Sequence, residues 1–213
     1  MNDTVLRARI VATARRMNEM GINQGSSGNV SARVAGGFFV TPSGVPYEAL
    51  EDADVVHVAM DGRATGRRAP SSEWRLHRDL YTKRPEAAAV VHTHSPYATT
   101  LACLGRGIPA FHYEVAFAGG SDIRCAPYRT FGTQDLSDAV CAAIEGRRAC
   151  LLGHHGAVAL GADLDDALRL ADKVEALARL YWQALQIGEP HTLGEEEMAR
   201  VVERFRDYGP RGK

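Results

Sequence analysis

Apolar residues recur every three or four positions in several stretches of the chain, the spacing that places them along one face of an α-helix. The longest such stripe follows Asp163 and includes Leu168, Val174 and Tyr181. Ser71 and Ser72 stand where a helix would begin, and we expect them to act as N-caps. The predicted helices cover residues 3–20, 71–83, 134–145, 163–185 and 195–205.

Short apolar runs between these helices are typical of β-strands. The predicted strands cover residues 38–41, 55–59, 89–94, 122–126, 149–152 and 157–160. Residues 23–29 are rich in turn formers, and residues 109–128 mix strand and loop character. Strands and helices alternate irregularly, which favours a layered α/β domain over a strict βαβ repeat. We therefore expect one domain over residues 1–213, in which residues 206–213 form a tail.

Composition and charge exclude several classes of protein. The chain has 213 residues and a net charge of -1, so it lacks the basic excess of a nucleic-acid-binding domain. The longest uncharged stretch, residues 87–105, contains His92, His94 and Pro96, which a membrane span does not readily tolerate. No apolar secretory segment opens the sequence, and its four cysteines form no CxxC pair. We expect a cytoplasmic protein that binds neither membranes nor nucleic acid.

Histidines provide the sharpest chemical signal in the sequence. His92 and His94 are two positions apart in a predicted strand, so their side chains share one face. A second pair, His154 and His155, lies between two glycines at the end of another predicted strand, and spacing does not choose between them. Three imidazoles with an open position are typical of a catalytic metal site. The alternative for the pair His92 and His94 is two core histidines hydrogen-bonded to their neighbours. We interpret the isolated His57, His77, His112 and His191 as structural or exposed.

Three short segments have the composition of anion-binding loops. They are residues 25–29 (GSSGN), residues 41–44 (TPSG) and the Ser71-Ser72-Glu73 sequence at a predicted helix start. Small residues allow backbone N–H groups to converge on an anion, and a helix N-terminus favours negative charge. Each segment alone is most simply a turn or a cap. Together with the metal candidate they indicate a phosphorylated substrate.

The ordered motifs GNVS (28–31), TPSG (41–44), SSEW (71–74), VVHTH (90–94), APYRTFGT (126–133) and GHHG (153–156) closely resemble those of the class II aldolase/adducin family. The resemblance covers nearly the whole chain. It implies a three-layer α/β/α domain around a central, mostly antiparallel sheet. It also implies a cyclic homotetramer whose active sites lie at subunit interfaces.

The resemblance assigns roles to individual residues. It implies a zinc ion, replaceable by manganese or cobalt, with His92, His94, His155 and Glu73 as ligands. The residues implied for phosphate binding are Gly28, Asn29, Ser43, Gly44, Ser71 and Ser72. Tyr113 would reach the neighbouring subunit's site as a proton-transfer residue, with Glu73 as the general acid/base. Phe131, Phe205 and Tyr208 would wall the aldehyde end.

The reaction that this family membership implies is cleavage of a ketose 1-phosphate to dihydroxyacetone phosphate and an aldehyde. The sequence leaves L-fuculose, 5-deoxyribulose and 5-methylthioribulose 1-phosphates open as substrates. A methylthioribulose-1-phosphate dehydratase and a pentulose-5-phosphate 4-epimerase are sister activities, although epimerase-like members carry Asp at the position of Glu73. An adducin-like interaction module is a remote alternative, which the three histidines disfavour. Lys83, Lys173 and Lys213 do not resemble the desolvated amine of a Schiff-base aldolase.

Overall fold

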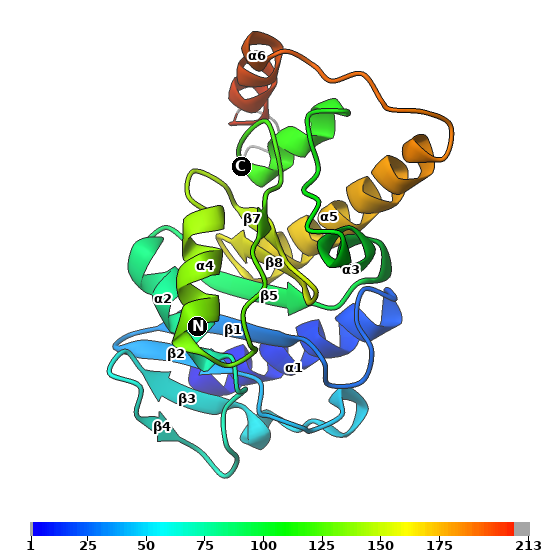
Figure 1. Cartoon of the computed structure of the whole chain (residues 1–213). Helices are drawn as coiled ribbons and strands as arrows, with labels where there is room; N and C mark the ends of the chain where they lie inside the picture. The colour runs from blue at the N-terminus through cyan, green and yellow to red at the C-terminus, as the bar shows by residue number, and fades with distance from the viewer. Residues whose placement is uncertain (1, 207–213) are drawn as a thin grey trace.

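A computed structural model describes residues 2–206 of the chain, and Figure 1 shows the arrangement of its elements. The helices are α1 (Asp3–Glu19), α2 (Trp74–Lys83), α3 (Pro96–Cys103), α4 (Gln134–Ala143), α5 (Leu164–Leu185) and α6 (Glu195–Arg206). The strands are β1 (Asn29–Val34), β2 (Gly37–Val40), β3 (Val56–Ala59), β4 (Ala64–Thr65), β5 (Ala89–Thr93), β6 (Cys125–Ala126), β7 (Ala149–Leu152) and β8 (Gly156–Gly161). Short 3-10 helices cover Tyr47–Ala49, Asp52–Asp54 and Tyr113–Ala118.

The strands form one sheet in the order β4-β3-β2-β1-β5-β8-β7-β6. All neighbouring strands are antiparallel except β6 and β7, which are parallel. Strand β5 therefore lies at the centre, between β1 and β8, and pairs Asn29 with His92 across the β1 border. The predicted mostly antiparallel sheet is confirmed.

Helices cover both faces of this sheet and produce two apolar cores (Figure 1). One core packs α1, α3 and α5 against one face, and the other packs α2 and α4 against the opposite face. Alternate residues of β5 divide between them, since Val91 belongs to the first core and Val90 to the second. The architecture is the predicted three-layer α/β/α arrangement.

Several predicted boundaries were wrong. Strand β1, which begins at the last residue of the segment predicted as turn, was missed, because its polar residues are buried with polar partners instead of alternating with apolar ones. Helix α3 was missed, since its short sequence of small and β-branched residues gives no helical stripe. The predicted strand at residues 122–126 is reduced to Cys125–Ala126. Ser71 and Ser72 do not cap α2, which begins at Trp74 with Glu73 in the N-cap position.

Candidate active site

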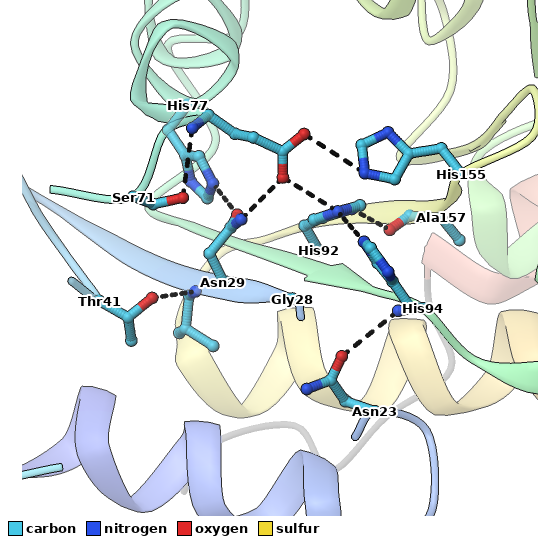
Figure 2. A network of polar contacts seen from close by, with 12 residues as sticks. Asn23, Gly28, Asn29, Thr41, Ser71, His77, His92, His94, His155 and Ala157 are labelled. Carbon is cyan, nitrogen blue, oxygen red and sulfur yellow. Dashed lines mark hydrogen bonds and ion pairs between the residues drawn. The ribbon is translucent and has the colours of Figure 1, made fainter. Parts of the chain in front are cut away.

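Three histidines from the ends of neighbouring strands meet at one end of the sheet. His92 lies on β5, His94 follows the end of that strand, and His155 lies in the tight turn between β7 and β8. One ring nitrogen of each lies within 4.8 Å of the others, and the Nε2 atoms of His92 and His94 are 3.0 Å apart. The three rings are nearly perpendicular to one another, with centroids 4.8 to 4.9 Å apart (Figure 2). In this arrangement one ring nitrogen of each histidine could bind the same metal ion.

Backbone conformation decides which histidine of the turn joins this cluster. His154 adopts a left-handed φ of 55°, and its N–H donates to the carbonyl of Ala102. Its side chain is exposed, whereas the side chain of His155 is largely buried beside His92. Gly156 follows because a Cβ there would lie 2.1 Å from the carbonyl oxygen of Thr93. The glycine thus lets β8 approach β5 closely enough to bring His155 into the cluster.

A backbone carbonyl fixes the tautomer of His92. Its Nδ1 lies 2.9 Å from the oxygen of Ala157, which can only accept a hydrogen bond, so Nδ1 carries a proton. Its Nε2 therefore faces the cluster as the atom available for coordination. Carbonyl support of this kind is common behind metal-binding histidines.

The carboxylate of Glu73 closes the group from the start of α2. Its Oε2 lies 3.2 Å from His92 Nε2 and accepts a hydrogen bond of 2.9 Å from the Asn29 side chain. Its Oε1 lies 3.4 Å from His155 Nε2 and has no hydrogen-bond partner although it is buried. Glu73 as a whole is 4% exposed. An unpaired carboxylate oxygen aimed at a cluster of imidazoles is what a bound cation would satisfy.

The electrostatic environment gives Glu73 and the neighbouring histidines shifted pKa values. Burial by itself would raise the pKa of the Glu73 carboxyl, but its interactions with the neighbouring His92 and His155 and its hydrogen bonds outweigh burial, and the pKa is well below its ordinary value. Burial and the nearby charge of His92 lower the pKa of His155 to about 4. Burial and the proximity of the His92 and His155 rings lower the pKa of His94 to about 3. The carboxylate is therefore ionised, and His94 and His155 are neutral at pH 7.

These residues fit a divalent metal. Neutral imidazole nitrogens and a carboxylate are the ligands that zinc prefers in catalytic sites. The geometry therefore supports the predicted ligand set of Glu73, His92, His94 and His155.

The predicted phosphate-binding segments lie side by side. Pro42 and Pro70 form an isolated β-bridge, and the Ser71 N–H donates to the Thr41 carbonyl at 3.0 Å. Thr41 Oγ1 in turn accepts a hydrogen bond from Val30 N–H, next to Gly28 and Asn29. The structure thus brings together all three segments, of which Ser43, Gly44 and Ser72 are exposed and Gly28, Asn29 and Ser71 are buried.

A cavity of about 360 Å³ adjoins the histidine cluster. It is lined by Ser27, Ser72, Glu73, His94, Tyr128, Arg129, Phe131, His154 and His155. The predicted Phe131 is therefore present. The resemblance assigned no role to Tyr128 and Arg129, although they belong to the same APYRTFGT motif. It assigned His155 to the metal and gave no role to the neighbouring His154. The position of a loop relative to a cavity depends on tertiary contacts that a motif does not contain.

Tyr113 and Phe205 lie in a different part of the folded structure. They line a separate cavity of about 530 Å³ with residues of α6, and Phe205 stacks on Phe117 with ring centroids 4.1 Å apart. Tyr113 is 49% exposed. The structure does not bring either residue to the histidine cluster of its own chain. The predicted Tyr208 and the predicted tail beyond Arg206 lie outside the described residues.

The fold and the site define an α/β/α protein with a histidine and glutamate cluster at the end of a central sheet. Residues 8–182 match the family described as the class II aldolase and adducin N-terminal domain. The chain belongs to this family, as its motifs predicted.

Comparison with individual proteins gives the same result. The chain is 52% identical to a 5-methylthioribulose-1-phosphate/5-deoxyribulose-1-phosphate aldolase of Rhodospirillum rubrum, over 96% of this chain and 92% of that protein. It is 46% identical to the L-fuculose phosphate aldolase of Escherichia coli K12, over 99% of both chains. A solved structure of an L-fuculose 1-phosphate aldolase superimposes with a TM-score of 0.92 at 36% identity, covering 94% of this chain and 96% of that one. The class II aldolase fold is therefore confirmed.

Proposed function

We propose that the chain is a metal-dependent class II aldolase that cleaves a ketose 1-phosphate to dihydroxyacetone phosphate and an aldehyde. The observation that carries this proposal is the buried Glu73 carboxylate, which faces His92 and His155 and lines a cavity with His94 and Ser72. The names of the relatives, which include a 5-methylthioribulose-1-phosphate/5-deoxyribulose-1-phosphate aldolase and an L-fuculose 1-phosphate aldolase, support the substrate class. The chain is thus an aldehyde-lyase.

Zinc is the metal we propose, held by His92, His94 and His155 with Glu73 as a further ligand. When bound, such an ion would polarise the carbonyl of the ketose and stabilise the negative charge that develops during cleavage. The chemistry of the donors supports this choice, since imidazole suits zinc better than it suits magnesium or calcium.

Glu73 is the general acid/base in this proposal. As the bond between C3 and C4 breaks, the C4 hydroxyl loses a proton and C3 gains one, and Glu73, once protonated, delivers that proton to C3. Positioned proton transfer of this kind contributes roughly 10²- to 10⁴-fold to a rate. The exposed Ser43, Gly44 and Ser72, together with the buried Gly28, Asn29 and Ser71, form the phosphate pocket, and Phe131 borders the aldehyde.

Tyr113 and Phe205 act in the site of a neighbouring subunit in this proposal. Tyr113 would hold a proton at the C4 oxygen, and Phe205, with Tyr208, would complete the aldehyde wall. The exposure of Tyr113 and its distance from the cavity that contains Glu73 support a role across a subunit interface. We propose a homotetramer on this basis and on the family resemblance.

We also propose that the chain is one domain that works in the cytoplasm. Its four cysteines are free, as is usual in a reducing compartment. Among the helices of residues 2–206, none combines the length and the apolar character needed to cross a membrane.

The decisive experiment incubates zinc-loaded protein with L-fuculose, 5-deoxyribulose and 5-methylthioribulose 1-phosphates and measures dihydroxyacetone phosphate. We expect release of dihydroxyacetone phosphate from at least one of them. Loss of water without carbon–carbon cleavage would show a dehydratase instead. Glu73→Gln should abolish exchange of the C3 proton of dihydroxyacetone phosphate with solvent while the protein stays folded, and the exposed Glu19→Gln is the matched control.

A further inference from the structure

A network of hydrogen-bonded, buried side chains continues from Glu73 away from the cavity. Glu73, His77 and Tyr81 are four positions apart and follow one face of α2, with Glu73 at its N-cap. Asn29 and Ser31 are two positions apart and follow one face of β1. The two rows interlock, so that each strand residue lies between two helix residues. Figure 2 shows Asn29 beside His77 in this arrangement.

Hydrogen bonds join all five side chains. Asn29 Nδ2 is 2.9 Å from Glu73 Oε2, and Asn29 Oδ1 is 2.5 Å from His77 Nε2. On the other side of the ring, His77 Nδ1 is 2.6 Å from Ser31 Oγ, which is 2.7 Å from the Tyr81 hydroxyl. None of the five residues is more than 4% exposed. Water therefore does not compete for these bonds.

The Glu73 carboxylate sets the direction of every hydrogen bond in this network. An ionised carboxylate can only accept, so the Asn29 amide must present its NH₂ group to Glu73 and its oxygen to His77. His77 must then donate from Nε2, which leaves Nδ1 to accept from Ser31. Ser31 in turn accepts from Tyr81. All donors thus point toward Glu73, an arrangement in which each bond polarises the next.

We propose that His77 is a positioning residue for Glu73, because its Nε2–H holds the Asn29 amide in the orientation that donates to the catalytic carboxylate. This inference rests on the proposed role of Glu73 in proton transfer. This hydrogen-bond network does not carry protons to solvent, since it ends at the buried Tyr81. Without the Nε2–H donor, Asn29 Oδ1 is buried without a partner and the amide is held only at its NH₂ end, which loosens its bond to Glu73 and the place of Glu73 between His92 and His155.

Substitutions that keep or remove the donor test this role. Gln retains an N–H group near the position of His Nε2, whereas Phe fills similar space without a donor. Loss of a hydrogen bond behind a catalytic or metal site commonly costs about 10- to 100-fold in activity. We expect His77→Phe to lower kcat by that factor with KM within about 3-fold, and His77→Gln to recover most of kcat. Tyr81→Phe is the control, because it removes a buried hydrogen bond of the same network without changing the donor to Asn29.

A spectroscopic measurement tests the proposal without catalysis. Nitrogen-15 NMR of histidine-labelled wild-type protein reports the tautomer of each ring, and comparison with the His77→Gln spectrum assigns His77. We expect the Nε2–H form. The Nδ1–H form would overturn the proposal, as would His77→Gln that folds and binds zinc but is as slow as His77→Phe. If His77→Phe does not fold, the tautomer and His77→Gln still decide. If wild-type protein cleaves no ketose 1-phosphate, the proposed function fails, and the tautomer still tests the orientation of Asn29.

Discussion

Gly28 allows the entry to β1 to approach β5 at the point where the active site is built. A Cβ on Gly28 would lie 2.3 Å from the carbonyl oxygen of His92 and 2.8 Å from Asn23 Oδ1, whereas ordinary contacts begin at 3.4 Å. The neighbouring Asn29 pairs with His92 across the β1–β5 border and donates to Glu73. Gly28→Ala therefore forces apart two strands that position the histidine cluster and Glu73, the proposed general acid/base.

The size of the effect follows from these distances. Relief of the contact with a backbone atom requires a movement of about 1 Å, the difference between 2.3 Å and 3.4 Å. Overpacking of a buried site costs about 1 to 3 kcal/mol, which lowers the melting temperature of a chain of this size by roughly 2 to 12 °C. The same shift takes the Asn29–Glu73 bond, now 2.9 Å, out of hydrogen-bond range. A displacement of about 1 Å at a catalytic group can cost about 100-fold in rate.

Thermal unfolding and steady-state kinetics measure both effects. The matched control is Gly188→Ala, since nothing lies within 4 Å of a Cβ on Gly188 and its φ is ordinary. We expect the control to retain wild-type stability and kcat/KM. Gly28→Ala with a melting temperature within about 1 °C and a kcat/KM within about 2-fold of wild type would refute the claim that the close approach of these strands builds the site.

Three further predictions concern the metal and pH. Removal of zinc by a chelator should lower the melting temperature by about 5 to 10 °C and abolish cleavage, both restored by zinc, because a ligand at about 100 times its Kd contributes about 2.7 kcal/mol. Elemental analysis of His92→Ala should show a sharp loss of zinc, whereas His112→Ala, outside the cluster, should retain it; equal zinc in both variants would contradict the ligand assignment. Burial lowers the pKa of His77 to about 3, so the stability that its neutral form contributes is complete above pH 6.5 and is lost as pH falls toward 3. His77→Gln should accordingly make the decline of unfolding free energy below pH 6.5 shallower, by at most about 1.4 kcal/mol per pH unit in denaturant titrations, and an unchanged slope would argue against it.

The sequence predicted those elements whose apolar pattern is regular. Helix α5 and strand β5 are examples, because a continuous stripe and an apolar run each allow only one buried arrangement. Strand β1 was missed for the opposite reason. Ser31 is buried there by bonds to His77 and Tyr81, residues far along the chain, so no local pattern indicates that it belongs to a core.

The candidate site shows the same division. His92 and His94 were recognised from strand spacing alone, and the structure places both in the cluster. The choice of His155 over His154 depends on a left-handed backbone conformation, which the sequence pattern left open and the family resemblance supplied. The interpretation of His77 as a structural histidine missed its contact with Asn29, because the interlocking of α2 with β1 appears only in the folded chain.

The separation of Tyr113 from Glu73 leads to a last prediction. The two residues line different cavities of one chain, so a site that needs both must take them from two subunits. Glu73→Gln and Tyr113→Phe should each be nearly inactive as pure proteins. When equal amounts are unfolded together and reassembled, each site draws its Glu73 and its Tyr113 independently, and about one quarter of the sites receive both native residues. Such mixtures should therefore recover about one quarter of wild-type activity, while mixtures of either variant with itself should recover none. A mixture no more active than its components would place both residues in one chain's site, and a fully active pure Tyr113→Phe would exclude Tyr113 from catalysis.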